Sequence, residues 1–182
     1  MDCLDGSDED DCNLVIVDWE NYRKQNKPHP IRGESSLGLK LWLEITNIDS
    51  IRELKGDYRV QFHLSVRWHD SRVMFQNLKE NLTHNMVDWE ISRHLWIPPL
   101  NFPNSFGDNR IMDDEHTYLL VNKNSDATFA TEEDIHENYF FNGTENELVY
   151  YRRFQLTHQC SFELHYFPFD TQYCKIEVSA YY

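Results

Sequence analysis

The sequence predicts an all-β protein, an antiparallel sandwich or barrel, on three observations. Residues 37–45 and 58–68 alternate apolar and polar side chains with a period of two, which is typical of half-buried strands. Shorter strand-like segments follow along the chain and are separated by turns. Helical composition is confined to residues 18–26. Many short strands with so little helix favour packed antiparallel layers.

The first expected element is a short helix over residues 18–26, DWENYRKQN. Asp18 is a suitable N-cap, and Pro28 and Pro30 end the segment because proline cannot continue a helix. The preceding residues 2–12 cannot pack into a core, since eight of these eleven residues are acids or cysteines.

Two long strands are expected next. In residues 37–45 the alternating apolar positions are Leu39, Leu41, Leu43 and Ile45. Residues 58–68 alternate without a break, so their even-numbered side chains are expected to face inward and their odd-numbered side chains outward. Gly56 lies in a turn between the two strands.

The rest of the chain contains further strand candidates, a proline-rich break and a long loop. The candidates are Leu95–Ile97, Tyr118–Val121, Glu137–Phe141, Leu148–Thr157 and Tyr173–Tyr182. Pro98, Pro99 and Pro103 exclude regular structure after Trp96. Residues 122–134 are polar and acidic and have no periodicity, which predicts a long exposed loop.

The composition favours a folded domain and excludes several functions. Hydrophobic residues make up 40% of the chain, which is enough to form a core. The net charge of −14 repels nucleic acid, so nucleic-acid binding is not expected. An enzyme is not expected either, because the sequence contains no nucleophile elbow, HExxH motif or phosphate-binding loop. There is no signal peptide and no apolar run of roughly 20 residues, so we expect a soluble piece of a longer chain.

Cysteines and glycosylation motifs together predict an oxidising, extracellular setting. The four cysteines form two groups, Cys3 with Cys12 and Cys160 with Cys174. Their spacing does not match that of a zinc site. Asn81 and Asn142 each begin an Asn-x-Thr sequon and are candidate N-glycosylation sites.

One segment carries a more specific pattern. Cys160 and Cys174 enclose thirteen residues, and a disulfide that closed a loop of this size would stabilise the fold by about 3 kcal/mol. Within it, residues 167–170 (FPFD) form a tight apolar turn of a kind in which the prolyl bond is sometimes cis. The thirteen-residue spacing and the FPFD turn together resemble the signature of the Cys-loop receptors, which are pentameric ligand-gated ion channels.

Other landmarks extend this resemblance over about residues 16–182. Residues 68–72 (WHDSR) resemble the family's W-x-D-x-R segment, and residues 95–98 (LWIP) resemble its W-x-P-D segment. Arg153, seven residues before Cys160, matches a frequent family arginine. Pro99 replaces the family aspartate that follows the W-x-P segment.

The resemblance implies an Ig-like antiparallel β-sandwich over residues 13–182. It implies a pentamer of identical or related subunits, a small ligand bound between neighbours, and coupling to a pore through the Cys-loop. The final strands and the transmembrane domain are expected beyond Tyr182, so this domain is incomplete. It would stand on the extracellular face of the plasma membrane. The alternative is a secreted ligand-binding protein of the same fold.

The resemblance also implies a ligand site with two walls. The principal wall would contain Tyr181, seven residues after Cys174, together with Asn101 and Phe102. Pro103 is a further candidate, and relatives often carry a ligand-facing aromatic where this chain has Asn101 and Pro103, so this wall is expected to be weaker than usual. An aromatic ring in such a wall attracts a ligand ammonium group.

The complementary wall would contain His63, Tyr151 and Arg153. His63 has an odd number and is expected to face outward, where its imidazole would contact a ligand or respond to pH. The alternative is an exposed or interface histidine with no role in binding. Arg153 would either grip a ligand carboxylate or form a structural ion pair. The candidate ligands are amines, amino acids and protons.

Two loops would couple ligand binding to the pore. In the family, the tip of the first hairpin presses on the membrane domain beside the FPFD turn. The residues at these positions are Asp49, Ile51 and Glu53 in the tip, and Phe167, Pro168, Phe169 and Asp170 in the turn. Ligand binding would then shift the population from closed to open states.

The acidic N-terminus resembles the end of an LDL-receptor class A repeat. The motif implies Ca²⁺ binding by Asp2, Asp8 and Glu9, because clustered carboxylates suit a hard cation. The first part of such a repeat is missing, and the alternative is a disordered acidic tail. No other cofactor is expected.

Overall fold

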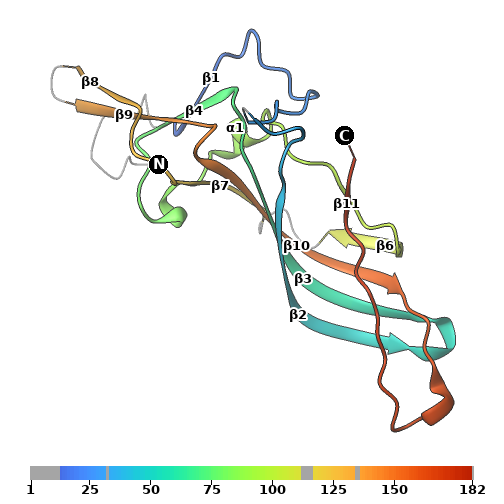
Figure 1. Ribbon diagram of the computed structural model, residues 1–182. Coiled ribbons are helices and arrows are strands. Elements are labelled where there is room, and N and C mark those ends of the chain that lie inside the picture. Colours follow the sequence, from blue (N-terminus) through green and yellow to red (C-terminus); the bar gives the residue numbers. More distant parts are fainter. Residues whose placement is uncertain (1–12, 32, 112–116, 134–135, 182) are drawn as a thin grey trace. The chain divides into compact units, whose positions relative to one another are not determined.

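The computed structural model describes residues 13–31, 33–111, 117–133 and 136–181 (Figure 1). The predicted all-β class is confirmed, because strands dominate the described residues and their only α-helix is α1, Trp89–Ser92. The chain forms two compact units. Unit 1 comprises residues 1–40, 67–96 and 118–150, and unit 2 comprises residues 41–66, 97–117 and 151–182.

Unit 1 contains a four-stranded sheet in the order β1-β4-β9-β8, with antiparallel pairs throughout. Its strands are β1 (Val15–Val17), β4 (Val73–Gln76), β8 (Phe129–Glu133) and β9 (His136–Asn142). The unit also contains β7 (Tyr118–Asn122), which pairs with β10 (Glu147–Gln159), and the 3-10 turn η2 (Leu82–His84). In the sheet, Phe75 pairs with both Val15 and Phe141, and all three side chains are buried.

A buried network centred on Asp70 holds unit 1 together. The Arg72 guanidinium donates two hydrogen bonds to the Asp70 carboxylate, at 2.8 and 2.7 Å. The Tyr22 hydroxyl donates to the same carboxylate and accepts from the Trp96 backbone N–H at 2.8 Å. Burial, together with the charge of Asp70, raises the pKa of Tyr22 to about 12. The W-x-D-x-R segment therefore ties the N-terminal residues to those after α1.

Unit 2 is built on a sheet in the order β2-β3-β10-β6. Its further strands are β2 (Lys40–Arg52), β3 (Asp57–Trp68) and β6 (Ser105–Ile111), and the 3-10 turn η1 (Glu53–Lys55) joins β2 to β3. Figure 1 shows β2, β3 and β10 running side by side. A separate short ladder pairs β5 (Leu100–Asn101) with β11 (Ser179–Ala180).

The alternation predicted for β3 is confirmed except at Ser65, which has an odd number and is buried. Its even-numbered side chains are buried from Tyr58 to Trp68, whereas Arg59 is exposed and Gln61 and His63 are half-buried. Phe62 stacks on Phe154 of β10 with their ring centroids 5.5 Å apart, and the Phe102 ring packs edge-on against both. These rings form the core of unit 2.

The strand expected at residues 37–45 is present as β2 but begins at Lys40 and extends to Arg52. Several of its apolar residues are open to solvent, namely Leu41, Ile45, Ile48 and Ile51. The predicted strands at Tyr118–Val121, Glu137–Phe141 and Leu148–Thr157 are confirmed as β7, β9 and β10.

The predicted helix at residues 18–26 is wrong, because the segment forms turns. Asp18 does cap the first turn, accepting from the Glu20 N–H and from the Asn21 side chain. The turn does not propagate into a helix. The Arg72 guanidinium donates to the backbone carbonyls of Arg23 and Asn26, so a distant part of unit 1 fixes the irregular path.

Three other predictions are also corrected. Residues Leu95–Ile97 form no strand, and the first two are buried directly after α1. Residues 173–182 contain only the two-residue strand β11 within the described part. The loop predicted at residues 122–134 contains β8, which pairs with β9 in an antiparallel hairpin from Phe129↔Phe140 to Glu133↔His136. Backbone pairing therefore ordered a segment that lacks apolar periodicity.

Candidate functional site

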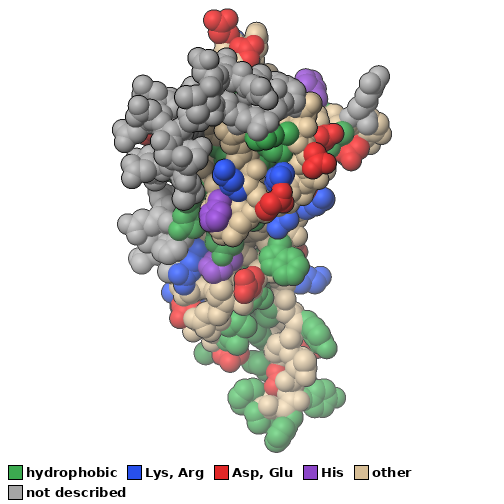
Figure 2. Space-filling view, turned by 90° about the vertical axis from the view of Figure 1, so that its left-hand side faces the viewer, with side chains coloured by type: hydrophobic (Ala, Val, Ile, Leu, Met, Phe, Trp, Pro, Cys, Tyr) green, Lys and Arg blue, Asp and Glu red, His purple; other side chains and the backbone are tan. Residues whose placement is uncertain are grey.

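The loop between Cys160 and Cys174 is closed by a disulfide, as expected. The Phe167–Pro168 peptide bond is cis. Within the loop, the Gln172 side chain accepts from the Glu163 N–H and donates to the Glu163 carbonyl, which closes its base. Its apolar tip is open to solvent, and Phe169 is 92% exposed. Figure 2 shows hydrophobic side chains gathered on the exposed surface at the end of unit 2 that this tip forms.

Backbone contacts attach the disulfide loop to the β2–β3 turn. The Cys160 N–H donates to the Gly56 carbonyl at 2.8 Å. Gly56 has a φ of +67°, and a Cβ there would lie 3.3 Å from the Cys160 carbonyl oxygen, so both conformation and space favour glycine. Beside it, buried Asp57 pairs with Arg52 at 2.5 Å. The turn and the loop base are thus fixed to each other.

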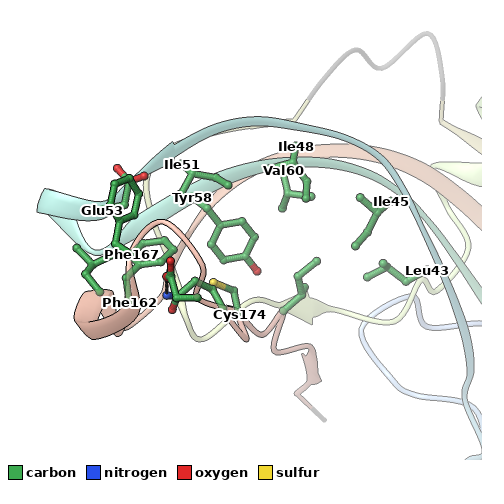
Figure 3. Close-up of a pocket in the computed structure, with 14 residues that line it drawn as sticks. Leu43, Ile45, Ile48, Ile51, Glu53, Tyr58, Val60, Phe162, Phe167 and Cys174 are labelled. Atoms are coloured by element: carbon green, nitrogen blue, oxygen red, sulfur yellow. Dashed lines mark hydrogen bonds between the residues drawn. The ribbon is translucent and has the colours of Figure 1, made fainter.

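An open groove of about 610 Å³ lies between the inner face of β2 and the disulfide loop. Figure 3 shows the apolar side chains of β2 and β3 facing those of the loop across it. Its lining includes Ile51 and Glu53 from the predicted tip, and Phe167 and Asp170 from the FPFD turn. The two predicted coupling segments therefore lie against one groove.

Asp49 differs from Ile51 and Glu53 in that it does not line this groove. The strand β2 continues to Arg52, so the turn itself is η1, and Asp49 is inside the strand. Its carboxylate lies 3.5 Å from the Arg59 guanidinium and accepts from the Gln155 amide at 3.4 Å. Asp49 thus contributes to cross-strand contacts rather than to a free tip.

The residues expected in the principal wall lie where β11 pairs with β5, with Ser179 opposite Asn101. The Asn101 amide donates to the Tyr181 hydroxyl at 3.0 Å, and the Tyr181 side chain is 62% exposed. Phe102, the third residue expected in this wall, is less open than Tyr181. It is buried in the aromatic core of unit 2 and is not an open wall of the site.

The complementary residues form a second group in unit 2. The rings of His63 and Tyr151 lie 5.2 Å apart, as centroids, on neighbouring strands β3 and β10. Next to them, the Arg153 guanidinium donates to the Gln61 side-chain oxygen at 3.0 Å. Arg153 is therefore held by a neutral amide, which leaves its charge uncompensated by this contact.

Sequence reasoning missed Trp42, whose side chain is 72% exposed on β2. Leu43 and Ile45 line the inner groove with Val60 of β3. Because strand side chains alternate between faces, Trp42 and Glu44 share the outer face with His63. The signal was available, since Trp42 occupies a polar position in the alternation.

Asn104 was also missed as a structural centre of unit 2. Its side-chain oxygen accepts from the Glu177 N–H at 3.1 Å and lies 3.0 Å from His158 Nδ1. Its amide donates to the Lys175 carbonyl at 2.7 Å. Because this oxygen is an acceptor, Nδ1 of the buried His158 is its donor. Asn104 thereby links the end of β10 to the segment that leads from Cys174 to Tyr181.

The remaining predicted sites lie elsewhere. Asn81 and Asn142 are both in unit 1, while Asp2, Asp8 and Glu9 lie outside the described residues. Among the residues that are described, His, Cys, Asp and Glu form no cluster of three or more that would suit a metal ion. The same residues include no helix with the length and apolar character of a membrane span.

Comparison with known proteins places these features in one family. The model of the neurotransmitter-gated ion-channel ligand binding domain matches residues 14–182. The gamma-aminobutyric acid receptor subunit beta of Lymnaea stagnalis is 28% identical over 84% of this chain and 28% of its own length. Subunit pi of Rattus norvegicus is 28% identical over 92% of this chain and 33% of its own length.

The chain thus spans about a third or less of the length of these relatives. The family match covers nearly all of its described residues, including the disulfide loop and both candidate walls. The chain belongs to the neurotransmitter-gated ion-channel ligand binding domain family.

Proposed function

We propose that this chain is the extracellular ligand-binding domain of a subunit in a pentameric ligand-gated channel. A small ligand binds between the principal wall of one subunit and the complementary wall of the next. The observation that carries the proposal is the Asn101–Tyr181 contact, because it joins an exposed aromatic ring to a second residue that the resemblance assigns to the ligand site.

The proposed ligand is a small amino acid, in keeping with the relatives named as gamma-aminobutyric acid receptor subunits. Arg153 supplies a guanidinium that recognises a carboxylate through paired hydrogen bonds, exchanging its Gln61 contact for the ligand. The Tyr181 ring attracts an ammonium group by cation–π interaction. A zwitterion satisfies both groups at once.

Coupling is proposed to run through the groove beneath the disulfide loop. Ile51 and Phe167 both line it, and Gly56 is hydrogen-bonded to the loop base. Movement of Tyr181 reaches this loop through the Asn104 contacts with Lys175 and Glu177. Ligand binding would thus shift the equilibrium between two positions that the exposed FPFD turn adopts where it contacts the membrane domain.

The test is the current evoked by gamma-aminobutyric acid in cells that express the full-length subunit. Tyr181→Ala should raise the half-maximal concentration by about 2- to 30-fold, because a cation–π contact of roughly 0.5–2 kcal/mol is lost. Tyr181→Phe keeps the ring and should shift it much less. Unchanged responses in Tyr181→Ala and in Arg153→Gln, at equal surface expression, would exclude these walls as the ligand site.

A further inference from the structure

The two sequons of unit 1 share one local geometry. In each, the asparagine side-chain oxygen accepts from the backbone N–H and the hydroxyl of the threonine two residues on. The distances are 3.1 and 2.9 Å at Asn81, and both are 2.8 Å at Asn142. In both motifs the oxygen Oδ1 is engaged and the amide nitrogen Nδ2 is the atom left for a glycan.

Asn81 is placed where a glycan costs the fold little. Asn81 and Thr83 are both exposed, and Asn81 caps the 3-10 turn η2. Within the described residues its Nδ2 donates no hydrogen bond. Because the cap uses Oδ1, a sugar attached to Nδ2 leaves the cap intact.

Asn142 is placed in a packed turn. It is half-buried at the end of β9, opposite Met74 of β4. Its backbone carbonyl accepts from the side chain of Asn146, which is fully buried. The middle residue of the sequon, Gly143, is buried as well.

Gly143 shows how little room this turn has. A Cβ on Gly143 would lie 2.2 Å from the Asp70 carbonyl oxygen and 2.6 Å from that of Val73. Even a methyl group would displace backbone that supports the Asp70 network, and a pyranose ring on the neighbouring half-buried amide is far larger. A chain with a glycan on Asn142 would have to open this turn in order to fold.

We infer that Asn81 carries an N-linked glycan in the folded protein and that Asn142 does not. The donor is a lipid-pyrophosphate-linked oligosaccharide. Its anomeric carbon–oxygen bond breaks and a bond from that carbon to Asn81 Nδ2 forms. The pyrophosphate leaves with the electron pair, and Nδ2 gives up one proton. The inference rests on the extracellular placement in the proposed function.

The experiment expresses the full-length protein in eukaryotic cells and recovers it from the cell surface. The wild type should lose the mass of one N-glycan on treatment with an amidase that removes such glycans, and peptide mass spectrometry should locate the converted residue at position 81. Asn81→Asp should abolish the shift. Asp caps a helical turn as well as Asn does, so this variant removes the acceptor nitrogen and keeps the cap.

Asn142→Asp is the matched control at the second sequon and should leave the shift unchanged. Thr83→Ser preserves the sequon and should keep the glycan, whereas Thr83→Ala should lose it. An unmodified Asn81, or a glycan on Asn142 in surface-recovered protein, would overturn the inference. If Cys160 and Cys174 form a disulfide while Asn81 carries no glycan, only the glycosylation inference is wrong. If both cysteines are free thiols as well, the extracellular placement is also wrong.

Discussion

His158 is a titratable side chain buried at the end of β10. Its ring lies against those of Tyr58 and Phe62, at centroid distances of 5.7 and 6.3 Å. Nδ1 donates to Asn104, and Nε2 has no hydrogen-bond partner in the described part of the structure. Burial lowers the pKa of His158 below its ordinary value of 6.5, since a charged imidazole would lose its hydration among these rings.

This residue should make the stability of unit 2 depend on pH. In the unfolded chain His158 takes up a proton near pH 6.5, whereas in the folded chain it resists protonation to lower pH. The unfolded state therefore binds more protons below this pH, and the free energy of unfolding falls as pH falls. The contribution of neutral, buried His158 to the free energy of unfolding is fully present above pH 6.5. Urea titrations between pH 7.5 and 5 should show the loss.

Two substitutions separate His158 from the other titrating groups. His158→Gln keeps a neutral donor for Asn104 but cannot titrate, so its stability should fall less steeply with acid. His84→Gln makes the same residue change on the exposed turn η2, outside the core of unit 2, and is the matched control. Identical slopes for His158→Gln and the wild type would show that burial of this ring does not set the pH dependence.

At the scale of elements, the predictable segments are those whose burial repeats along one strand. β3 follows from sequence because each even-numbered residue meets the core of its unit. The helix predicted at residues 18–26 does not form. Arg72, which is distant in sequence, donates hydrogen bonds to the Arg23 and Asn26 carbonyls and so holds this segment in an irregular path. The loop predicted at residues 122–134 is wrong for a different reason. Part of it forms β8, which pairs with β9 through backbone groups, and amino-acid composition does not reveal such pairing.

The disulfide loop is the element whose stability is most directly testable. Replacing Cys160 and Cys174 together by Ser should lower the free energy of unfolding by about 3 kcal/mol, since a loop of this size loses its constraint in the unfolded chain. Urea denaturation of the oxidised wild type and the variant measures the difference. The double variant avoids a lone thiol. A loss of under about 1 kcal/mol would show that contacts such as that of Gly56 hold the loop without the bond.

At the scale of the whole molecule, the sequence predicted the positions of the family's motifs along the chain better than it predicted which of their side chains are buried or exposed. Spacing to a cysteine or to a Trp-Pro segment selected the disulfide loop and the two residues, Asn101 and Tyr181, that the structure brings into contact. The burial of Phe102 could not be predicted from sequence, because a residue's place next to a short strand does not show which side of the strand faces the core. Trp42 could have been identified from sequence, because it occupies a polar position in the alternation of β2, opposite in face to the groove-lining Leu43.

The outer face of β2 gives a test of assembly. Interfaces are enriched in aromatic residues and depleted in acids, and the exposed Trp42 lies on the same face as His63, in the proposed complementary side. We expect the full-length subunit to be a pentamer by native mass spectrometry. Trp42→Glu should dissociate it, because it adds a buried charge to a chain already at −14, while Trp42→Phe should not. A monomeric wild type would refute the assembly, and an intact Trp42→Glu pentamer would place the interface on another face.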